Sequence, residues 1–350
     1  MDDFESPLHG VGKGPKQRSS ARHRRTPSWL RPRILWAVVG LVTIVGTGVA
    51  GAILTLPASH NLGARHLPRS VGRYTTTRIA PLPPFKIQDE TLTLLDPSRA
   101  TPARGSVPGH TGRDLVTIVR RPVGLPGPLP LVVFAHGWNS NPLVYESLLD
   151  AWAEAGYIVA APTFPDSANT LPGSPVSDYP EQAQDMSFVI SSLRGGLAGP
   201  VDMSRIAVAG HSDGGTDVAL MALNPRYGDP RVRAYISLSG EIPVGLTGPW
   251  GVPVAGALLV AVGTADEYGL LSRSLQVFQA AVMPKVVLTL ASGDHLNTFI
   301  GDSPAEIAMR TDTVNFLHSV FSTPTTTSAQ LQAALMATGD PAIALQAGPG

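Results

Sequence analysis

The sequence predicts an α/β fold with a mostly parallel sheet covered by helices on both faces. Short β-branched runs alternate with helical stretches from residue 91 to residue 321, and strand–helix alternation at this pitch produces right-handed crossovers and a parallel sheet. Hydrophobic residues make up 43% of the 350 residues and charged residues only 15%, which excludes a disordered, self-repelling chain. The 36 glycines and 33 prolines follow no triplet period, which excludes a collagen-like repeat and indicates many tight turns.

The elements can be placed in order along the chain. Residues 57–90, rich in Pro, Arg and Thr, are expected to form a tether. Thr91–Leu95 and Asp114–Val119 are expected to open the folded domain, 91–321, as an antiparallel pair, and the continuous apolar run Leu129–Ala135 predicts a buried strand. The further elements expected are helices over Pro142–Ala155, Tyr179–Leu193, 213–223, 268–281 and 303–320, and strands over Tyr157–Pro162, Arg205–Ala209, Ala234–Leu238, Gly256–Val262 and Lys285–Leu290. The tail 322–350 is Thr-, Ala- and Gly-rich, with a short helix expected near 328–336.

The charges are distributed unevenly although the formal net charge is zero. Residues 1–33 contain eight Lys and Arg but only three acidic residues, so that of 26 basic and 26 acidic residues 18 and 23 remain for positions 34–350. A mildly acidic body argues against nucleic-acid binding. The chain has no cysteine, which excludes disulfides, thiolate catalysis and cysteine-ligated metals.

The basic segment 1–33 is followed by a long apolar run. Residues 34–56 contain no charged side chain over 23 residues, and about 20 apolar residues span the hydrocarbon core of a bilayer as a helix. The positive-inside rule then places residues 1–33 in the cytoplasm and the body outside. The sequence therefore predicts a single-pass protein of the cell membrane whose folded domain is extracytoplasmic. A signal peptide cleaved near Ala52 is the alternative, and it would release the body as a secreted protein.

A G-x-S-x-G motif stands between an expected strand and an expected helix. The sequence reads Gly210-His-Ser212-Asp-Gly214 directly after the apolar run that ends at Ala209. A turn of this kind is so sharp that a Cβ atom two residues before or after the serine would collide with neighbouring chain. The bare motif is a weak signal, but its position between strand and helix predicts that Ser212 is a nucleophile with an exposed Oγ.

A serine nucleophile needs a base, which is expected after the acid in the chain. Only His295 and His318 follow the candidate acids. His295 follows the last expected strand, where the loop lies at the carboxyl edge of the sheet. His318 falls late in an expected helix, where a packing role is favoured. We therefore predict His295 as the base.

The orienting acid is expected on a loop between the serine and the base. Asp266 follows the expected strand Gly256–Val262 and is the predicted acid. Its neighbour Glu267 is one alternative. Glu241, which follows the expected strand Ala234–Leu238, is a second.

The oxyanion hole is expected to consist of two backbone N–H groups. One belongs to Asp213, which follows the nucleophile, and the other to Trp138, on the loop after the strand that ends at Ala135. His136 on that loop is expected to brace it by hydrogen bonding, and His211 is expected to point away from the serine Oγ. A carboxylate at Asp213 disfavours anionic substrates unless its side chain is tied elsewhere.

Four aromatic residues are candidate walls of a substrate pocket. They are Trp138, Tyr145, Phe164 and Tyr179, which lie on or beside the loops expected around the serine.

The order of the motifs resembles the α/β-hydrolase superfamily. Within it, residues 88–321 are similar to a bacterial branch related to chlorophyllases, platelet-activating-factor acetylhydrolase-like proteins and cutinase-like lipases. The motifs that carry the resemblance are H-G-W at 136–138, G-H-S-D-G-G at 210–215, G-T-A-D at 263–266 and G-D-H at 293–295. The resemblance implies the α/β-hydrolase fold, the catalytic residues Ser212, Asp266 and His295, and the oxyanion donors Trp138 and Asp213. Polyester hydrolases of this branch commonly have methionine where this chain has Asp213.

The resemblance implies a serine esterase or lipase that cleaves small-molecule or lipid carboxylic esters through an acyl-enzyme intermediate. This chemistry needs no cofactor, and the sequence has no P-loop, no G-x-G-x-x-G and no H-E-x-x-H, so we predict neither a cofactor nor a metal. Only residues 240–253 separate two expected strands, which predicts an open cleft without a full helical lid. Three alternatives remain, namely acyl transfer by the same residues, peptide cleavage, and a non-catalytic binding protein on a hydrolase fold.

Overall fold

The computed structural model describes residues 84–251, 254–336 and 343–348. The predicted basic segment 1–33, the predicted membrane helix 34–56 and most of the predicted tether lie outside the described residues. Within the described ranges, no helix is both long enough and apolar enough to cross a bilayer. The predictions about the membrane therefore remain predictions.

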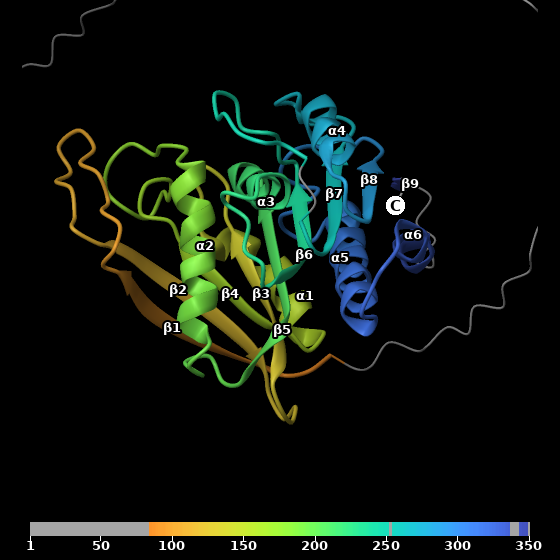
Figure 1. Ribbon diagram of the computed structural model, residues 1–350, viewed down its shortest axis with the longest axis horizontal. Coiled ribbons are helices and arrows are strands. Elements are labelled where there is room, and N and C mark those ends of the chain that lie inside the picture. The colour runs from red at the N-terminus through yellow and green to blue at the C-terminus, as the bar shows by residue number, and fades with distance from the viewer. Residues whose placement is uncertain (1–83, 252–253, 337–342, 349–350) are drawn as a thin grey trace, which may run out of the picture. The chain divides into compact units, whose positions relative to one another are not determined.

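The described residues form one mixed sheet in the order β1-β2-β4-β3-β5-β6-β7-β8-β9 (Figure 1). Strands β3 to β8 are parallel to one another, whereas β1 and β2 form an antiparallel hairpin at one edge and β9 pairs antiparallel with β8 at the other. The strands are β1 (Ile87–Asp96), β2 (Arg113–Pro122), β3 (Leu129–Ala135), β4 (Ile158–Thr163), β5 (Val201–His211), β6 (Val232–Leu238), β7 (Ala257–Gly263), β8 (Lys285–Leu290) and β9 (Ile343–Ala347). The predicted parallel sheet is confirmed.

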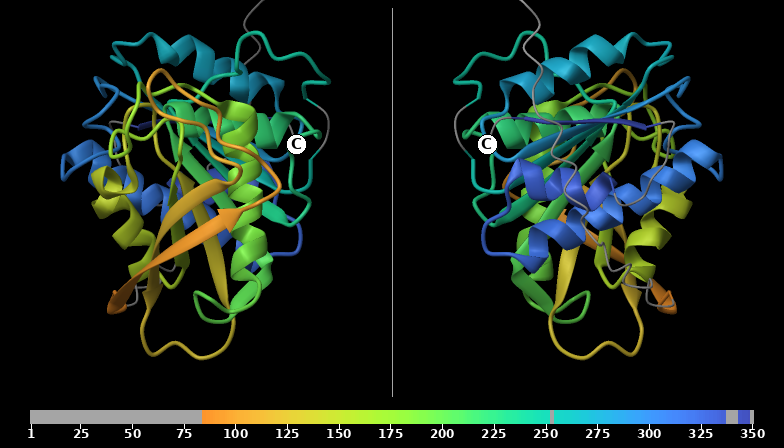
Figure 2. Two further views of the ribbon diagram at one scale, coloured as in Figure 1. Left: turned by 90° about the vertical axis from the view of Figure 1, so that its left-hand side faces the viewer. Right: turned by 90° about the vertical axis from the view of Figure 1, so that its right-hand side faces the viewer.

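Helices cover both faces of this sheet, as predicted. The helical elements are η1 (Pro142–Tyr145), α1 (Glu146–Glu154), α2 (Tyr179–Leu193), α3 (Asp213–Leu223), α4 (Leu270–Ala280), α5 (Pro304–Ser322) and α6 (Ser328–Met336). Helices α2, α3 and α4 contribute to one apolar core, and α1, α5 and α6 to the other. Figure 2 shows the β1–β2 hairpin (orange) beside α2 (green) in its left view, and the blue helices of the opposite face in its right view.

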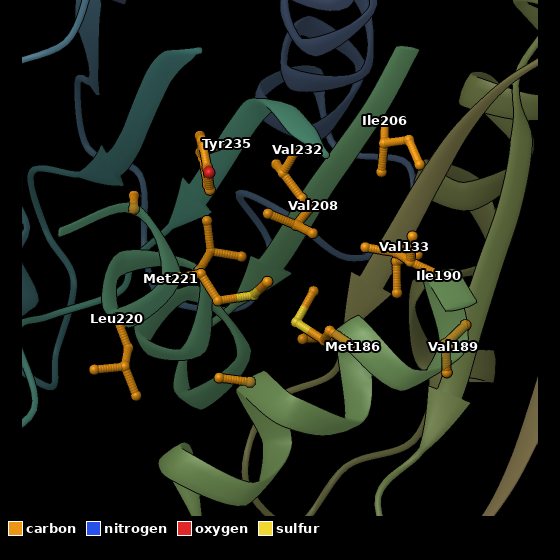
Figure 3. Close-up of a cluster of buried hydrophobic side chains, with 14 of the residues drawn as sticks. Val133, Met186, Val189, Ile190, Ile206, Val208, Leu220, Met221, Val232 and Tyr235 are labelled. Atoms are coloured by element: carbon orange, nitrogen blue, oxygen red, sulfur yellow. The ribbon is translucent and has the colours of Figure 1, made fainter. Parts of the chain in front are cut away.

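The central strands are buried on both sides, which explains their continuous apolar runs. Because side chains alternate along a strand, Val133 of β3 points into the core beneath α2 and α3, whereas its neighbours Val132 and Phe134 belong to the core on the other face. Figure 3 shows Val133 and Val208 of the sheet near Met186 of α2 and Met221 of α3. This packing holds β3 and β5 firmly, and the site described below begins at their carboxyl ends.

The structure corrects the predicted limits of the folded domain. Strand β1 begins at Ile87, so the predicted tether ends before residue 90. The predicted tail 322–350 holds the expected helix, α6, but it also contributes β9, which was not predicted. Leu331 and Leu335 of α6 are buried in the core that α1 and α5 share. The domain therefore extends beyond residue 321 to at least Gly348, whose N–H donates to the carbonyl of Lys285.

Candidate active site

Ser212 occupies a strained turn between β5 and α3. Its backbone angles are φ 58° and ψ −119°. Residues other than glycine rarely adopt this backbone conformation. A Cβ at Gly210 would lie 2.2 Å from the carbonyl oxygen of Gly214, and one at Gly214 would lie 2.1 Å from that of Ala135. The predicted need for glycine on both sides of the serine therefore follows from contacts with backbone, which cannot give way.

The structure brings Ser212, His295 and Asp266 into one hydrogen-bonded chain. His295 Nε2 lies 3.0 Å from Ser212 Oγ, and His295 Nδ1 lies 2.8 Å from Asp266 Oδ2. His295 and Asp266 are only 4% and 8% exposed, whereas Ser212 is half-buried. Because a carboxylate only accepts, Nδ1 carries the proton, and Nε2 of the neutral ring is free to accept the serine proton.

The alternative acids have other partners. The Glu267 carboxylate accepts the backbone N–H of His295 at 3.0 Å rather than a ring proton. Glu241 forms an ion pair with Arg273 at 2.8 Å. Among the three candidates, Asp266 is the one whose carboxylate contacts the His295 ring. The rejected base, His318, stacks on Tyr157 with the ring centroids 5.6 Å apart.

Two residues of the acid loop, Glu267 and Tyr268, have supporting contacts that the sequence did not predict. Glu267 holds the His295 backbone, as described above. Tyr268 donates its N–H to Asp266 Oδ1 at 3.1 Å, and its ring meets the His295 ring edge-on with centroids 4.6 Å apart. The only sequence signal for these contacts is that the two residues follow Asp266 at the next two positions.

The loop after β3 lies against the nucleophile. A Cβ at Gly137 would be 3.2 Å from Ser212 Cβ, so the glycine permits this close approach. His136 accepts the N–H of Phe164 at Nε2 (3.1 Å), and its Nδ1 donates to the carbonyl of Gly137 at 2.9 Å. Burial lowers the pKa of His136 to about 4, so the ring is neutral at pH 7. His136 braces the loop as the sequence predicts.

The two predicted oxyanion donors flank Ser212 from different elements. Trp138 follows Gly137 on the loop after β3, with its side chain 50% exposed. Asp213 is the first residue of α3, and N–H groups in the first turn of a helix have no intrahelical partner. Both N–H groups therefore belong to residues that are next to Ser212 or next to the Gly137 that lies against it. Their role in binding an oxyanion remains a prediction.

The Asp213 side chain is tied elsewhere. Its carboxylate accepts hydrogen bonds from the hydroxyl of Ser177 and, at 3.2 Å, from that of Tyr179. Burial raises the pKa of Asp213 above its usual value, and these two hydrogen bonds oppose the shift. The two hydroxyl groups hold the Asp213 carboxylate near the start of α2. Such partners are needed if the carboxylate beside Ser212 is not to disfavour anionic substrates.

The structure corrects the placement of two predicted pocket residues, Phe164 and Tyr145. Phe164 is fully buried in the core, and Tyr145 is 2% exposed. Burial raises the pKa of Tyr145 to about 12, so its hydroxyl stays protonated. Tyr179 is half-buried and directs its hydroxyl to Asp213. Aromatic character alone did not distinguish a pocket wall from a residue that packs beneath the site.

Large apolar side chains, the predicted wall residue Trp138 among them, are exposed in segments at the same edge of the sheet as Ser212. All of them follow the carboxyl ends of parallel strands, which meet at the same edge of a sheet. They are Trp138, Leu143 and Val144 after β3, Val176 after β4, Val244 after β6, Tyr268 after β7 and Leu296 after β8. In the described part of the loop that follows β6, residues 239–251 and 254–256, there is no helix. No group of three or more His, Asp or Glu side chains within the described ranges is arranged to hold a metal ion.

Comparisons with known proteins agree with this fold. The chlorophyllase family model matches residues 113–245. Esterase YjfP of Escherichia coli (strain K12) is 31% identical over 134 residues, 37% of this chain. This stretch is 52% of that relative, so the chain spans about half the length of the curated protein that it matches.

A solved structure shares the fold. The ferulic acid esterase from Streptomyces cinnamoneus superposes with a TM-score of 0.52 at 22% sequence identity, over 70% of this chain and 91% of that one. The chain therefore shares the fold of this esterase. Over part of its length it is also similar in sequence to chlorophyllases and to esterase YjfP. The family match includes the Trp138 loop and Ser212 but ends before Asp266 and His295, so these two assignments depend on the geometry given above.

Proposed function

We propose that this chain is a serine hydrolase that cleaves carboxylic esters. The observation that supports the proposal best is the hydrogen-bonded chain from Ser212 Oγ through His295 to Asp266, at 3.0 and 2.8 Å. This arrangement on a strained strand–helix turn is what nucleophilic acyl transfer requires. The similarity to proteins named as esterases supports the same reaction class.

The first half of the reaction forms an acyl-enzyme. Ser212 Oγ attacks the ester carbonyl carbon while His295 Nε2 takes the serine proton, and Asp266 holds the ring in the required tautomer. The carbonyl oxygen becomes an oxyanion, which the N–H groups of Trp138 and Asp213 stabilise. Collapse of this intermediate breaks the bond to the alcohol oxygen, which leaves with the proton from His295.

The second half repeats these steps with water. His295 removes a proton from a water molecule, whose oxygen attacks the acyl carbon. The second tetrahedral intermediate releases the carboxylic acid, and the proton returns through His295 to Ser212 Oγ. Each half therefore starts with His295 neutral and with its Nε2 able to accept a proton.

The substrates that the site favours are uncharged, apolar esters. Exposed Trp138, Tyr268 and Leu296 offer apolar surface beside the reacting groups, and the Asp213 carboxylate is held by hydroxyl groups. A small-molecule or lipid ester fits these surroundings. The chlorophyllase and ferulic acid esterase names among the similar proteins are consistent with an apolar or aromatic ester.

The site of action that we propose is the outer face of the cell membrane. This proposal depends on the sequence alone, namely the charge-free run 34–56 after the basic segment 1–33. Protease added to intact cells should digest the folded domain and spare residues 1–33. A fully protected domain would contradict this topology, and a domain found only in the medium would favour the cleaved signal peptide.

Ester hydrolysis by the purified full-length protein tests the proposed reaction. A panel of p-nitrophenyl esters of increasing acyl length should be hydrolysed, and Ser212→Ala should abolish turnover. Ser239→Ala is a matched control, because Ser239 also has a positive φ (46°) and its buried hydroxyl has no partner among the described residues. Retained turnover in Ser212→Ala would reject the proposal. Added alcohol that diverts most of the acyl group to a new ester would favour acyl transfer instead.

A further inference from the structure

We propose that Tyr145 and His211 are positioning residues that connect the oxyanion loop to the catalytic base through a directed relay of hydrogen bonds. The relay runs from the Gly137 N–H to the Tyr145 hydroxyl (3.2 Å), then to His211 Nδ1 (3.0 Å), and from His211 Nε2 to the backbone carbonyl of His295 (2.9 Å). This inference rests on the proposed function, since it assigns these residues to the same site.

The direction of every bond in the relay is fixed by its two ends. The carbonyl of His295 only accepts, so His211 Nε2 carries a proton and donates it. Burial lowers the pKa of His211 to about 3, so the ring is neutral and its Nδ1 is an acceptor. The Tyr145 hydroxyl therefore donates to Nδ1, and its oxygen is left to accept the Gly137 N–H. Reversal of any one bond would place two donors or two acceptors together.

The relay holds the base from one side while Glu267 holds it from the other. His211 donates to the carbonyl of His295, and the Glu267 carboxylate accepts the N–H of the same residue. The His211 ring also packs against the His295 ring with centroids 4.7 Å apart. With Asp266 on Nδ1, both backbone polar groups and the ring of His295 are held by side chains.

At its other end the relay holds the loop that carries the oxyanion donor. Gly137 directly precedes Trp138 and lies against Ser212, where its added Cβ would come within 3.2 Å of Ser212 Cβ. The donor loop and the base are far apart in the sequence, and Tyr145 and His211 join them by buried side chains. A displacement of the Gly137 loop or of the His295 backbone is thereby resisted by the other. The relay therefore keeps the Trp138 N–H and the His295 ring in a fixed relative position.

The test compares Tyr145→Phe with Tyr235→Phe in the full-length protein. Both changes remove one buried tyrosine hydroxyl, but that of Tyr235 has no hydrogen-bond partner among the described residues. We expect Tyr145→Phe to lower kcat about tenfold to a hundredfold with little change in KM, because misplacement by about 1 Å costs on the order of 10²-fold in rate. Affinity for a boronic acid, which mimics the tetrahedral intermediate, should fall with kcat. Tyr235→Phe should leave all three quantities unchanged.

A second pair of variants and a spectroscopic readout separate positioning from stability. His211→Gln keeps an N–H donor and a carbonyl acceptor and should retain more kcat than His211→Leu at equal thermal stability. Nitrogen NMR of the wild-type protein should show His211 as the Nε2–H tautomer from pH 5 to 8, and Tyr145→Phe should weaken that preference. An Nδ1–H tautomer in the wild type, or wild-type kcat and boronic-acid affinity in Tyr145→Phe, would overturn the relay.

Ser212→Ala, assayed in parallel, distinguishes the two levels of the proposal. If Ser212→Ala is inactive while Tyr145→Phe behaves as wild type, the relay is wrong and the serine hydrolase stands. If Ser212→Ala retains turnover, the proposed function fails and the relay fails with it.

Discussion

The domain buries two groups of polar side chains that are built on different principles. The active-site network consists of Ser212, His295 and Asp266 together with His211 and Tyr145, and its neutral members each have one possible direction of donation. The arginine cluster consists of Arg99, Arg113, Asp166 and Asp185, in which guanidinium groups face carboxylates. The active-site network fixes which atoms donate and which accept each hydrogen bond. The arginine cluster joins structural elements by ion pairs.

The arginine cluster fastens the β1–β2 hairpin to helix α2. Arg113 of β2 is fully buried and forms a bidentate pair with Asp185 of α2, at 2.8 and 2.7 Å. Burial opposes its charge, but the hydrogen bonds to Asp185 hold the pKa of Arg113 above its usual range. The comparison indicates that several ion pairs join structural elements in the arginine cluster, whereas at the proposed site of proton transfer a single carboxylate, that of Asp266, contacts the His295 ring.

The largest effect should come from breaking the active-site network at its reacting atoms. Ser212→Ala and His295→Ala should each lower kcat on the order of 10⁴–10⁶-fold, and the double variant should be little worse, because the residues act as one unit. Single-turnover and steady-state kinetics measure this. Losses that multiply in the double variant would mean that the two residues act separately.

The next largest effect should come from the acid. Asp266→Asn should lower kcat about 10⁴-fold, because an amide favours the wrong tautomer of His295. Glu267→Gln is the matched control, since its amide oxygen still accepts the backbone N–H of His295 and kcat should change little. Steady-state kinetics of both variants on one ester decide between them. A larger loss in Glu267→Gln than in Asp266→Asn would move the acid to Glu267.

Breaking the arginine cluster should affect stability and leave the chemistry intact. Arg113→Met should lower the free energy of unfolding by about 3–5 kcal/mol, because it leaves Asp185 buried without its main partner. Arg113→Met combined with Asp185→Leu should recover part of that loss. Urea unfolding measures stability, and titration of active sites gives kcat per folded molecule, which should equal the wild-type value. A loss of kcat in folded Arg113→Met would show that the two groups are coupled.

The smallest effect concerns pH and the buried neutral histidines. An unfolded histidine has a pKa of about 6.5, whereas burial lowers the pKa of His211 to about 3 and that of His136 to about 4. Depressed folded-state values contribute stability that is present above about pH 6.5 and is lost as the pH falls toward 4 and 3. Each histidine should add about 1.4 kcal/mol per pH unit to the slope below pH 6.

Urea unfolding of the full-length protein between pH 6.5 and 4.5 measures this slope. His136→Gln should reduce this slope by about 1.4 kcal/mol per pH unit, the effect of one bound proton, whereas His110→Gln, which alters an exposed histidine side chain, should not. Equal slopes in the wild type and His136→Gln would show that His136 is not held neutral by the fold.

Local signals in the sequence were sufficient to predict the parallel strands of the sheet and the three residues, Ser212, His295 and Asp266, that form the hydrogen-bonded chain. Leu129–Ala135, Tyr179–Leu193 and Lys285–Leu290 were predicted to the residue, because continuous apolar runs or helical periodicity ended at glycine, proline or polar residues. Ser212 was predicted from glycines that the turn requires. Strand β9 escaped prediction because its five residues, IALQA, are short and Ala-rich and pair with a strand more than fifty residues earlier.

The supporting residues of the site could not be predicted, because their roles depend on contacts between distant segments. Tyr145 was taken for a pocket wall, and only the folded chain shows its hydroxyl between Gly137 and His211. His211 was correctly expected to point away from Ser212 Oγ, but its partner is the backbone of a residue 84 positions later. Glu267 and Asp266 both contact His295, at its backbone N–H and at its ring Nδ1 respectively, and their adjacent positions in the sequence do not distinguish these two roles.

The most direct test of the central claim is covalent labelling of the nucleophile. The full-length protein is treated with a fluorophosphonate, and intact-mass and peptide mass spectrometry locate the adduct. We predict one adduct per chain, on Ser212, with labelling that is lost in Ser212→Ala, strongly slowed in Asp266→Asn and unchanged in Ser239→Ala. Ester hydrolysis that persists in the unlabelled Ser212→Ala protein, or a stoichiometric adduct on another residue, would contradict the account.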